Sequence, residues 1–187
     1  MGTPLPPGPF SIGLHPMQLD SNWQVSFQQV EELATSPQCI AIGECGFDRR
    51  SLSSTFLQSE VFLRHIQLAN LVRKPIIIHC VKMHDLLIKY RKESSVPLIL
   101  HGFNNKAQTG KMLLDAGFYI SFGISLLHNV SLQAFALEVP IERIFLETDD
   151  STVPIQSLYS TLSTLKELSI SAVQTQMLKN LQTITDI

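Results

Sequence analysis

The chain has 187 residues, of which 44% are hydrophobic and 16% are charged, and its formal net charge is −2. This composition is typical of a globular enzyme, and we expect a single domain over residues 1–187. The nearly neutral charge excludes a general attraction to nucleic acid, so binding of that kind would need a local basic patch. We expect no membrane span and no signal peptide, because no apolar stretch approaches about 18 residues and the N-terminus lacks a basic region followed by an apolar one.

Strand and helix signals alternate along the chain after an extended, Pro- and Gly-rich lead-in over residues 1–9. Apolar runs bounded by turn residues predict six strands, at residues 10–14, 40–44, 75–79, 98–101, 118–123 and 144–149. Apolar residues at helical spacing predict a helix capped by residue 21 or 22 and a long helix that carries Phe56, Phe62, Ile66 and Ala69. Further helices are predicted at residues 85–92, 107–116, 155–168 and 171–181, with a short helical stretch before the last strand. The alternation predicts a right-handed parallel α/β fold with two strands fewer than a closed (β/α)8 barrel.

Four of the predicted strands end on a side chain that can bind a metal ion. These side chains are Glu44, His79, His101 and Asp149. Chemistry in parallel α/β barrels is carried by groups at the carboxyl ends of the strands, so we expect the four to converge. Two imidazoles with carboxylates accept zinc, manganese, iron or nickel, and magnesium fits a mixed site. The pattern therefore predicts a metallohydrolase.

The last strand leaves a choice of acid. Strand alternation places Glu147 and Asp149 on the same face, whereas Asp150 faces the other way or begins the loop. We favour Asp149 as the ligand and give Glu147 a structural role or a role in supporting a ligand.

Other residues of these types have simpler explanations. His65, His84 and His128 fall on predicted helices or loops and are expected at the surface. A helical stripe of Phe56, Phe62 and Ile66 is expected in the core. The three cysteines, Cys39, Cys45 and Cys80, predict free thiols in a reducing cytoplasm, because none form a CxxC pair.

The candidate residues lie in five blocks of sequence. In chain order the blocks are Gly13-Leu14-His15-Pro16, residues 41–48, residues 75–79, His101-Gly102-Phe103 and Leu146-Glu147-Thr148-Asp149. Their order and spacing resemble the TatD-like metal-dependent deoxyribonucleases, and their wording is most similar to a short branch of that family found in bacteria. The resemblance covers the chain from Phe10 onward. It implies a TIM-type (β/α)8 barrel of the metal-dependent hydrolase kind, with one or two divalent ions at its mouth and DNA ends as substrate.

The resemblance also implies a role for each matching residue. Glu44 would bridge the metal ions, and His79 and His101 would bind one ion through imidazole. Asp149 would bind metal and take the proton of the attacking water, so Asp149 and Glu44 are the predicted catalytic residues.

The predicted substrate contacts are His15, from the first block, and Lys82, which follows the strand of His79. Asp48 is a weaker candidate, for a position behind a ligand. Arg49 and Arg50 form a polar turn that lies near enough to Glu44 in sequence to help hold a phosphate.

The chain departs from the family at its start. The family opens with a strand that carries a His-x-His pair, and this chain has no such pair. We therefore expect an N-terminally incomplete barrel, whose open strand edge could pair with a second copy in a homodimer. Two alternatives to a nuclease remain: a non-catalytic or one-metal remnant of the family, and a hydrolase of a small ester or amide. The sequence shows no aromatic and basic surface for bases, so the prediction of DNA depends on the resemblance.

Overall fold

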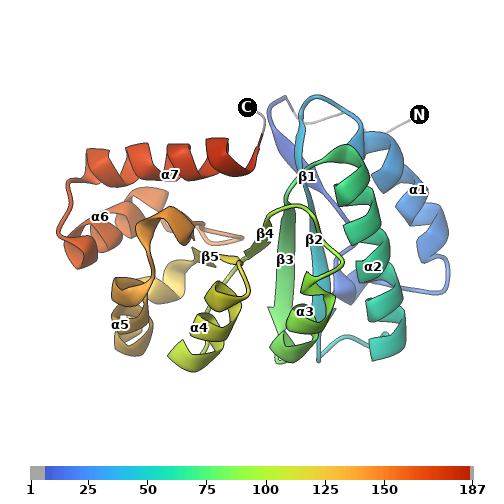
Figure 1. Cartoon of the computed structure of the whole chain (residues 1–187), viewed down its shortest axis with the longest axis horizontal. Coiled ribbons are helices and arrows are strands. Elements are labelled where there is room, and N and C mark those ends of the chain that lie inside the picture. Colours follow the sequence, from blue (N-terminus) through green and yellow to red (C-terminus); the bar gives the residue numbers. More distant parts are fainter. Residues whose placement is uncertain (1–6, 186–187) are drawn as a thin grey trace. The chain divides into compact units, whose positions relative to one another are not determined.

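The computed structural model describes residues 7–185, so most of the predicted lead-in lies outside the described residues. The chain divides into two compact units, Met1–Val96 and Pro97–Ile187 (Figure 1). Within residues 7–185, no helix combines the length and the apolarity that a membrane-spanning segment requires.

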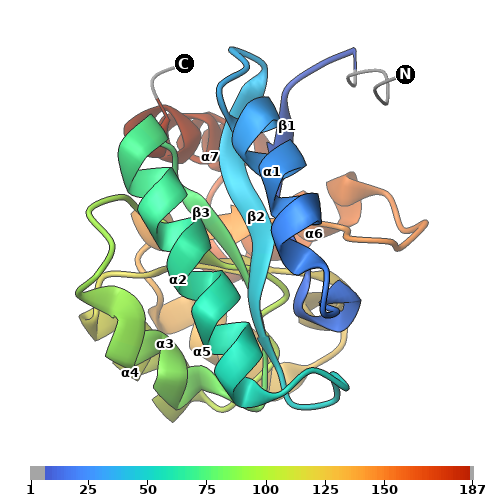
Figure 2. The same ribbon diagram turned by 90° about the vertical axis from the view of Figure 1, so that its right-hand side faces the viewer.

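The first unit is a parallel sheet with helices on one face. Its strands are β1 (Phe10–Ile12), β2 (Cys39–Asp48) and β3 (Ile76–Val81), and β2 pairs with both of the others. Its helical segments are η1 (Pro16–Gln18), α1 (Trp23–Ala34), α2 (Thr55–Val72) and α3 (His84–Arg91). Figure 2 shows α1 and α2 side by side over the same face of the strands.

Two local features explain the length and position of α2. Ser54 begins the helix by accepting a hydrogen bond from the Leu57 amide. Phe62 and Ile66 face inward and are almost completely buried, and the ring of Phe62 meets that of Phe47 from β2 at 5.0 Å. Packing of this face against β2 therefore fixes the helix on the sheet.

The second unit repeats the same strand-helix alternation. Its strands β4 (Leu98–Leu100), β5 (Tyr119–Phe122) and β6 (Ile144–Leu146) are parallel, with β5 between the other two. Its helical segments are α4 (Ala107–Asp115), η2 (Ile124–Leu127), α5 (Val130–Glu138), η3 (Ile141–Arg143), α6 (Ile155–Lys166) and α7 (Ile170–Ile184). The buried Asn180 joins α7 to the sheet, because its side-chain amide donates to the carbonyls of Ile141 and Ile144 at 2.8 Å each.

The six predicted strands are all present in the described residues, and two of them, β2 and β6, end more than two residues away from the predicted position. β2 does not end at Glu44; it continues to Asp48 alongside β3, and Cys45 and Phe47 in this extension have no exposed area. β6 ends at Leu146 rather than at Asp149, so the argument from strand alternation does not apply to the acids that follow it.

Phe56 was also placed wrongly. Its side chain is 79% exposed in the first turn of α2, although Phe62 and Ile66 of the same expected stripe are buried.

His65 is not at the surface as predicted; it has no exposed area. Its Nε2 accepts a hydrogen bond from the Leu14 amide at 3.0 Å, and its Nδ1 lies 2.8 Å from the carbonyl oxygen of Val61. The ring is therefore neutral with its proton on Nδ1, because a carbonyl oxygen can only accept. Burial lowers the pKa of His65 to about 4, from an ordinary value of 6.5. This ring fixes the residue that precedes His15.

We expect His65 to make the protein less stable in acid. Between pH 6.5 and about pH 4, His65 binds a proton in the unfolded chain but not in the folded protein. The free energy of unfolding therefore falls as the pH falls. The total loss should be about 3 kcal/mol. Urea unfolding at a series of pH values measures it. His65→Gln, which cannot titrate, should show a clearly smaller slope in this window, and equal slopes for the two proteins would contradict the assignment.

Candidate metal centre

Three side chains of the first unit come close enough to share an ion. The ligand atoms of His15, Glu44 and His79 all lie within 4.8 Å of one another. The rings of His15 and His79 meet edge to face, with their centroids 4.2 Å apart. An imidazole pair with a carboxylate is a donor set that suits zinc and other transition metals. The structure thus groups His15, predicted as a substrate contact, with two of the predicted ligands.

Glu44 is positioned by an irregularity in the middle of β2. The register with β3 shifts between Ile42 and Cys45, which is where a bulge re-aims a side chain. Gly43 lies within the shift and Gly46 follows it, at φ of +138° and +137°. A Cβ atom at these positions would come within 2.3 Å and 2.2 Å of carbonyl oxygens of β3. Only glycine fits such a close approach of the two strands, so the backbone around Glu44 has one arrangement.

A buried carboxylate orients the ring of His79. Oδ2 of Asp48 lies 2.9 Å from Nε2 of His79, and the Asp48 side chain has no exposed area. Because the carboxylate only accepts, Nε2 of His79 donates to it, and Nδ1 is the ring nitrogen that can offer a lone pair to a metal ion. Metal-binding histidines typically have such a carboxylate on the other ring nitrogen. Asp48, the weaker candidate in the sequence, is thus placed directly behind His79.

Asp48 is itself held from two sides. Arg50 donates from Nε to Oδ1 at 3.0 Å and from a terminal nitrogen to Oδ2 at 2.7 Å. The Arg50 guanidinium, and after it the His79 ring, hold the pKa of the Asp48 carboxyl below its ordinary value in spite of burial. The side-chain amide of Gln58, from α2, bonds both the N–H and the C=O of Asp48. The carboxylate therefore has a fixed position and a fixed charge.

His15 differs from His79 in the place of its proton. The amide of Met17 donates to Nδ1 of His15 at 3.2 Å as the chain enters η1. Nδ1 is therefore unprotonated, and Nε2 of the neutral ring carries the hydrogen. A ring in this form donates a hydrogen bond from Nε2, whereas a metal ligand needs a lone pair there. The distances to Glu44 and His79 alone would allow His15 to bind a metal ion. The hydrogen on its Nε2 instead favours a hydrogen bond from His15 to an anion.

In the second unit another imidazole forms a hydrogen bond with a carboxylate. Nδ1 of His101, the residue after β4, lies 3.2 Å from Oε1 of Glu147. The same carboxylate accepts hydrogen bonds from the Gly102 amide and, through Oε2, from the hydroxyl of Ser121 in β5. His101 therefore donates from Nδ1 and carries its lone pair on Nε2, the form that a metal ion binds. Glu147 is thus placed directly behind His101, and its support of a metal ligand stays a prediction.

The other predicted site residues lie on loops. Asp149 follows β6 by three residues at φ of +49°, and it lines a hollow of about 240 Å³ in the second unit together with Glu147 and Asp150. Lys82 follows β3 at φ of +58° and is exposed. The structure thus brings Glu44 and His79 together in the first unit. The assignments of His101, Asp149 and Lys82 to the same reaction stay predictions.

Sequence reasoning missed the supports of these rings. Arg50, Gln58 and Ser121 were not connected with Asp48 or Glu147. Two features of the sequence could have indicated these contacts. Asp48 follows Glu44 at an even spacing in one strand, and the hydroxyl residue Ser121 stands between the apolar residues 120 and 122 of a short buried strand.

The cysteines do not belong to the candidate metal centre. All three cysteines are free, and burial raises the pKa of Cys80 beside His79 to about 12, so its thiol stays protonated.

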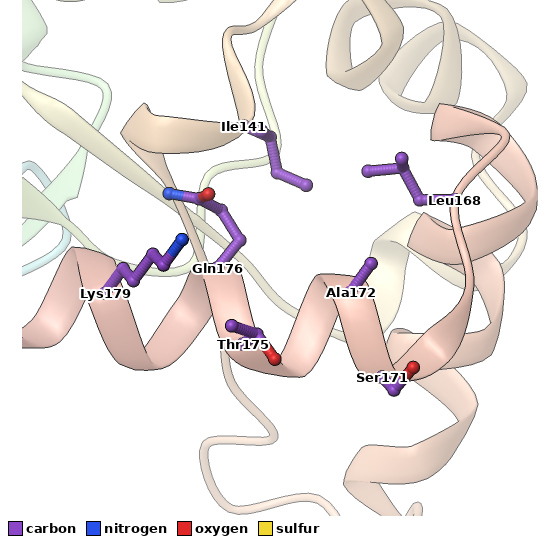
Figure 3. A pocket seen from close by; sticks show the side chains of 7 residues that line it. All are labelled: Ile141, Leu168, Ser171, Ala172, Thr175, Gln176 and Lys179. Atoms are coloured by element: carbon purple, nitrogen blue, oxygen red, sulfur yellow. The ribbon is translucent and has the colours of Figure 1, made fainter.

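The second unit has a larger hollow, of about 400 Å³, along α7 (Figure 3). Its lining consists of Ile141, Leu168, Ser171, Ala172, Thr175, Gln176 and Lys179. None of these seven residues carries a carboxylate or an imidazole, so this hollow does not resemble a metal site.

Comparisons with known proteins give a consistent result. Residues 8–186 match the model of a family described as TatD related DNase. A protein of Escherichia coli K12, described as the uncharacterized metal-dependent hydrolase YcfH, is 36% identical over 146 residues, which are 75% of this chain and 54% of that protein. The 3'-5' ssDNA/RNA exonuclease TatD of Klebsiella pneumoniae is 31% identical over 147 residues, 74% of this chain and 56% of that protein. The chain spans about half the length of these curated relatives.

A solved structure shows the same fold. The crystal structure of YjjV, a TatD homologue from Escherichia coli K12, superposes with a TM-score of 0.78 at 21% identity and covers 95% of this chain and 76% of that one. The predicted fold class is confirmed: an α/β fold with six parallel strands, of the TIM-barrel hydrolase type.

We expect Asp48→Asn to weaken metal binding by about 10- to 100-fold, because the asparagine loses the charge that orients and polarises His79. Competition with a chromogenic chelator measures the affinity, and a thermal melt checks that the variant folds. The matched control is Asp85→Asn, which changes an exposed carboxylate at the start of α3. Equal metal affinity of the two variants would contradict the role given to Asp48.

Proposed function

Because the chain belongs to the TatD related DNase family of metal-dependent hydrolases, we propose that it hydrolyses phosphodiester bonds at the ends of DNA strands. The observation that carries the proposal is the set of hydrogen bonds made by its imidazoles, from which the tautomer of each ring follows. His79 and His101 each donate one ring nitrogen to a carboxylate and offer a lone pair on the other. His15 has the opposite form. His79 and His101 are therefore in a form that can bind a metal ion, whereas His15 is in a form that donates a hydrogen bond.

The donor set fits a divalent ion. Glu44 contributes a carboxylate next to the lone pair of His79, and the family resemblance adds His101 and Asp149. A divalent ion held by these residues would lower the pKa of a water molecule to about 7 and polarise a phosphoryl oxygen. One or two ions of zinc, manganese, iron, nickel or magnesium suit this mixture of nitrogen and oxygen ligands.

The remaining steps belong to side chains of this chain. Asp149 takes the proton of the attacking water as general base, with the carboxylate pocket around Glu147 beside it. His15 donates its Nε2 hydrogen to a phosphoryl oxygen and stabilises the charge that develops there. Lys82, exposed at the end of β3, adds a positive charge for the phosphate.

The proposal gives His15 a role that can be separated from metal binding. We expect His15→Ala to keep the metal content of the wild type and to lower kcat on a labelled oligonucleotide by about 10²- to 10³-fold. Elemental analysis and steady-state kinetics measure the two quantities. His128→Ala, a change at an exposed histidine of the second unit, is the control. Loss of metal from His15→Ala would show that His15 is a ligand instead.

Removal of the ion tests the whole function. Dialysis against a chelator should abolish cleavage, and added Mn²⁺ or Zn²⁺ should restore it. His101→Ala should lose both metal and activity, because the ring supplies a ligand. Metal without cleavage in the wild type would identify a non-catalytic relative. Hydrolysis of a para-nitrophenyl ester without cleavage of DNA would favour a small ester as the substrate.

A further inference from the structure

The segment between β2 and α2 exposes apolar side chains beside two arginines. Leu52 is fully exposed, and Phe56 is 79% exposed, although a buried position was expected for it. Arg49 and Arg50 precede them and are exposed too. Burial of apolar surface is favourable, so a large aromatic ring and a leucine held in water next to positive charge suggest a bound partner. We call Arg50, Leu52 and Phe56 the β2–α2 surface.

This segment is held in place by its own hydrogen bonds. The hydroxyl of Ser51 donates to the carbonyl of Pro16 at 2.7 Å, and the Ser53 amide donates to the Ser51 hydroxyl at 3.1 Å. The side chain of Gln58 bonds the carbonyl of Ser53 at 3.1 Å. Leu52 lies between two serines that these hydrogen bonds hold in place, so its exposed side chain is on an ordered segment. A surface that is ordered in advance loses less entropy when it binds a ligand.

The same segment adjoins the candidate metal centre. Oδ2 of Asp48 contacts Nε2 of His79 at 2.9 Å and a terminal nitrogen of Arg50 at 2.7 Å, so one oxygen joins the metal-binding ring to the arginine. The Arg50 side chain is nevertheless 64% exposed. Its two bonds to Asp48 use two of the five guanidinium N–H groups, and the others point away from that carboxylate. Guanidinium groups of this kind bind phosphate with two parallel hydrogen bonds.

We propose that the β2–α2 surface binds a single-stranded segment of the nucleic acid substrate, next to the phosphodiester bond that is cleaved. Arg50 binds a backbone phosphate, the ring of Phe56 stacks against a base, and Leu52 of the same segment adds apolar surface. The proposal rests on the proposed function and adds how the strand is recognised. Charge complementarity selects this occupant, because a polyanion needs both the arginine and the apolar surface, whereas a second copy of the chain would need only the latter.

Binding is measured best without cleavage. Fluorescence anisotropy of a labelled oligothymidylate, with the full-length chain in EDTA, reports the Kd alone. We expect Phe56→Ala to raise the Kd by about 5- to 100-fold and Leu52→Ala to raise it less. On a strand with abasic sites, the effect of Phe56→Ala should disappear, because no base is left to stack. Arg50→Gln should lower the slope of log Kd against log salt by about one unit.

The controls change the same residue types at the other end of α2. Leu71 is 80% exposed, and Arg73 ends the helix. Leu71→Ala and Arg73→Gln should leave the Kd unchanged. A thermal melt and sedimentation of each variant exclude misfolding and a change in oligomeric state.

The outcomes separate this proposal from the proposed function. If Phe56→Ala binds the oligonucleotide like wild type, the β2–α2 surface is not the strand site, whatever the enzyme cleaves. If Phe56→Ala instead shifts sedimentation from dimer to monomer, the surface is a contact between copies, and the proposal is overturned. Hydrolysis of bis(para-nitrophenyl) phosphate by the wild type with Mn²⁺ tests the phosphodiesterase by itself. Its absence would reject the function, while strand binding in EDTA would still support the surface.

Discussion

A carboxylate without exposed area has to be compensated, and the first unit is organised around the compensation of Asp48. An unpaired charge in such a place would cost several kcal/mol. Arg50 supplies a countercharge, His79 a ring N–H, and Gln58 fixes the backbone on either side. Each of these contacts also has a second effect: it orients the ring of a predicted metal ligand, holds an exposed guanidinium, or joins the strand end to α2. Structural stability and the candidate chemistry therefore depend on the same bonds.

Much of the fold could be predicted because its signals are local. Apolar runs such as Ile76–Val81 and the caps of α2 depend on neighbouring residues, and all six strands occur where those runs stand. Predictions failed where contacts distant in sequence decide. β2 continues past Glu44 because glycines let it approach β3, and His65 is buried because it accepts a bond from a residue 51 positions away. The prediction for Phe56 failed for a local reason: it stands six residues before Phe62, so the two side chains point about 120° apart around the helix.

The candidate site shows the same limit. Residue types predicted Glu44, His79, His101 and Asp149 as ligands and Asp48 and Glu147 as supporting acids, because a carboxylate or imidazole at a predicted strand end is visible in the sequence. The positions of the ring protons are not visible there. They follow from the Asp48, Glu147 and Met17 contacts, and these distinguish His15 from the other two histidines.

The contact between Asp48 and Arg50 also has a consequence for the order of binding. Glu44 and Asp48 contribute two formal negative charges and Arg50 one positive charge, so the cluster as a whole repels an anion. Arrival of a divalent cation reverses the sign of that sum, and the candidate metal centre then attracts a phosphate. Under the proposed function, the phosphate to be cleaved would therefore settle at the centre only after the metal ion, whereas a neighbouring part of the strand can bind the β2–α2 surface with or without metal.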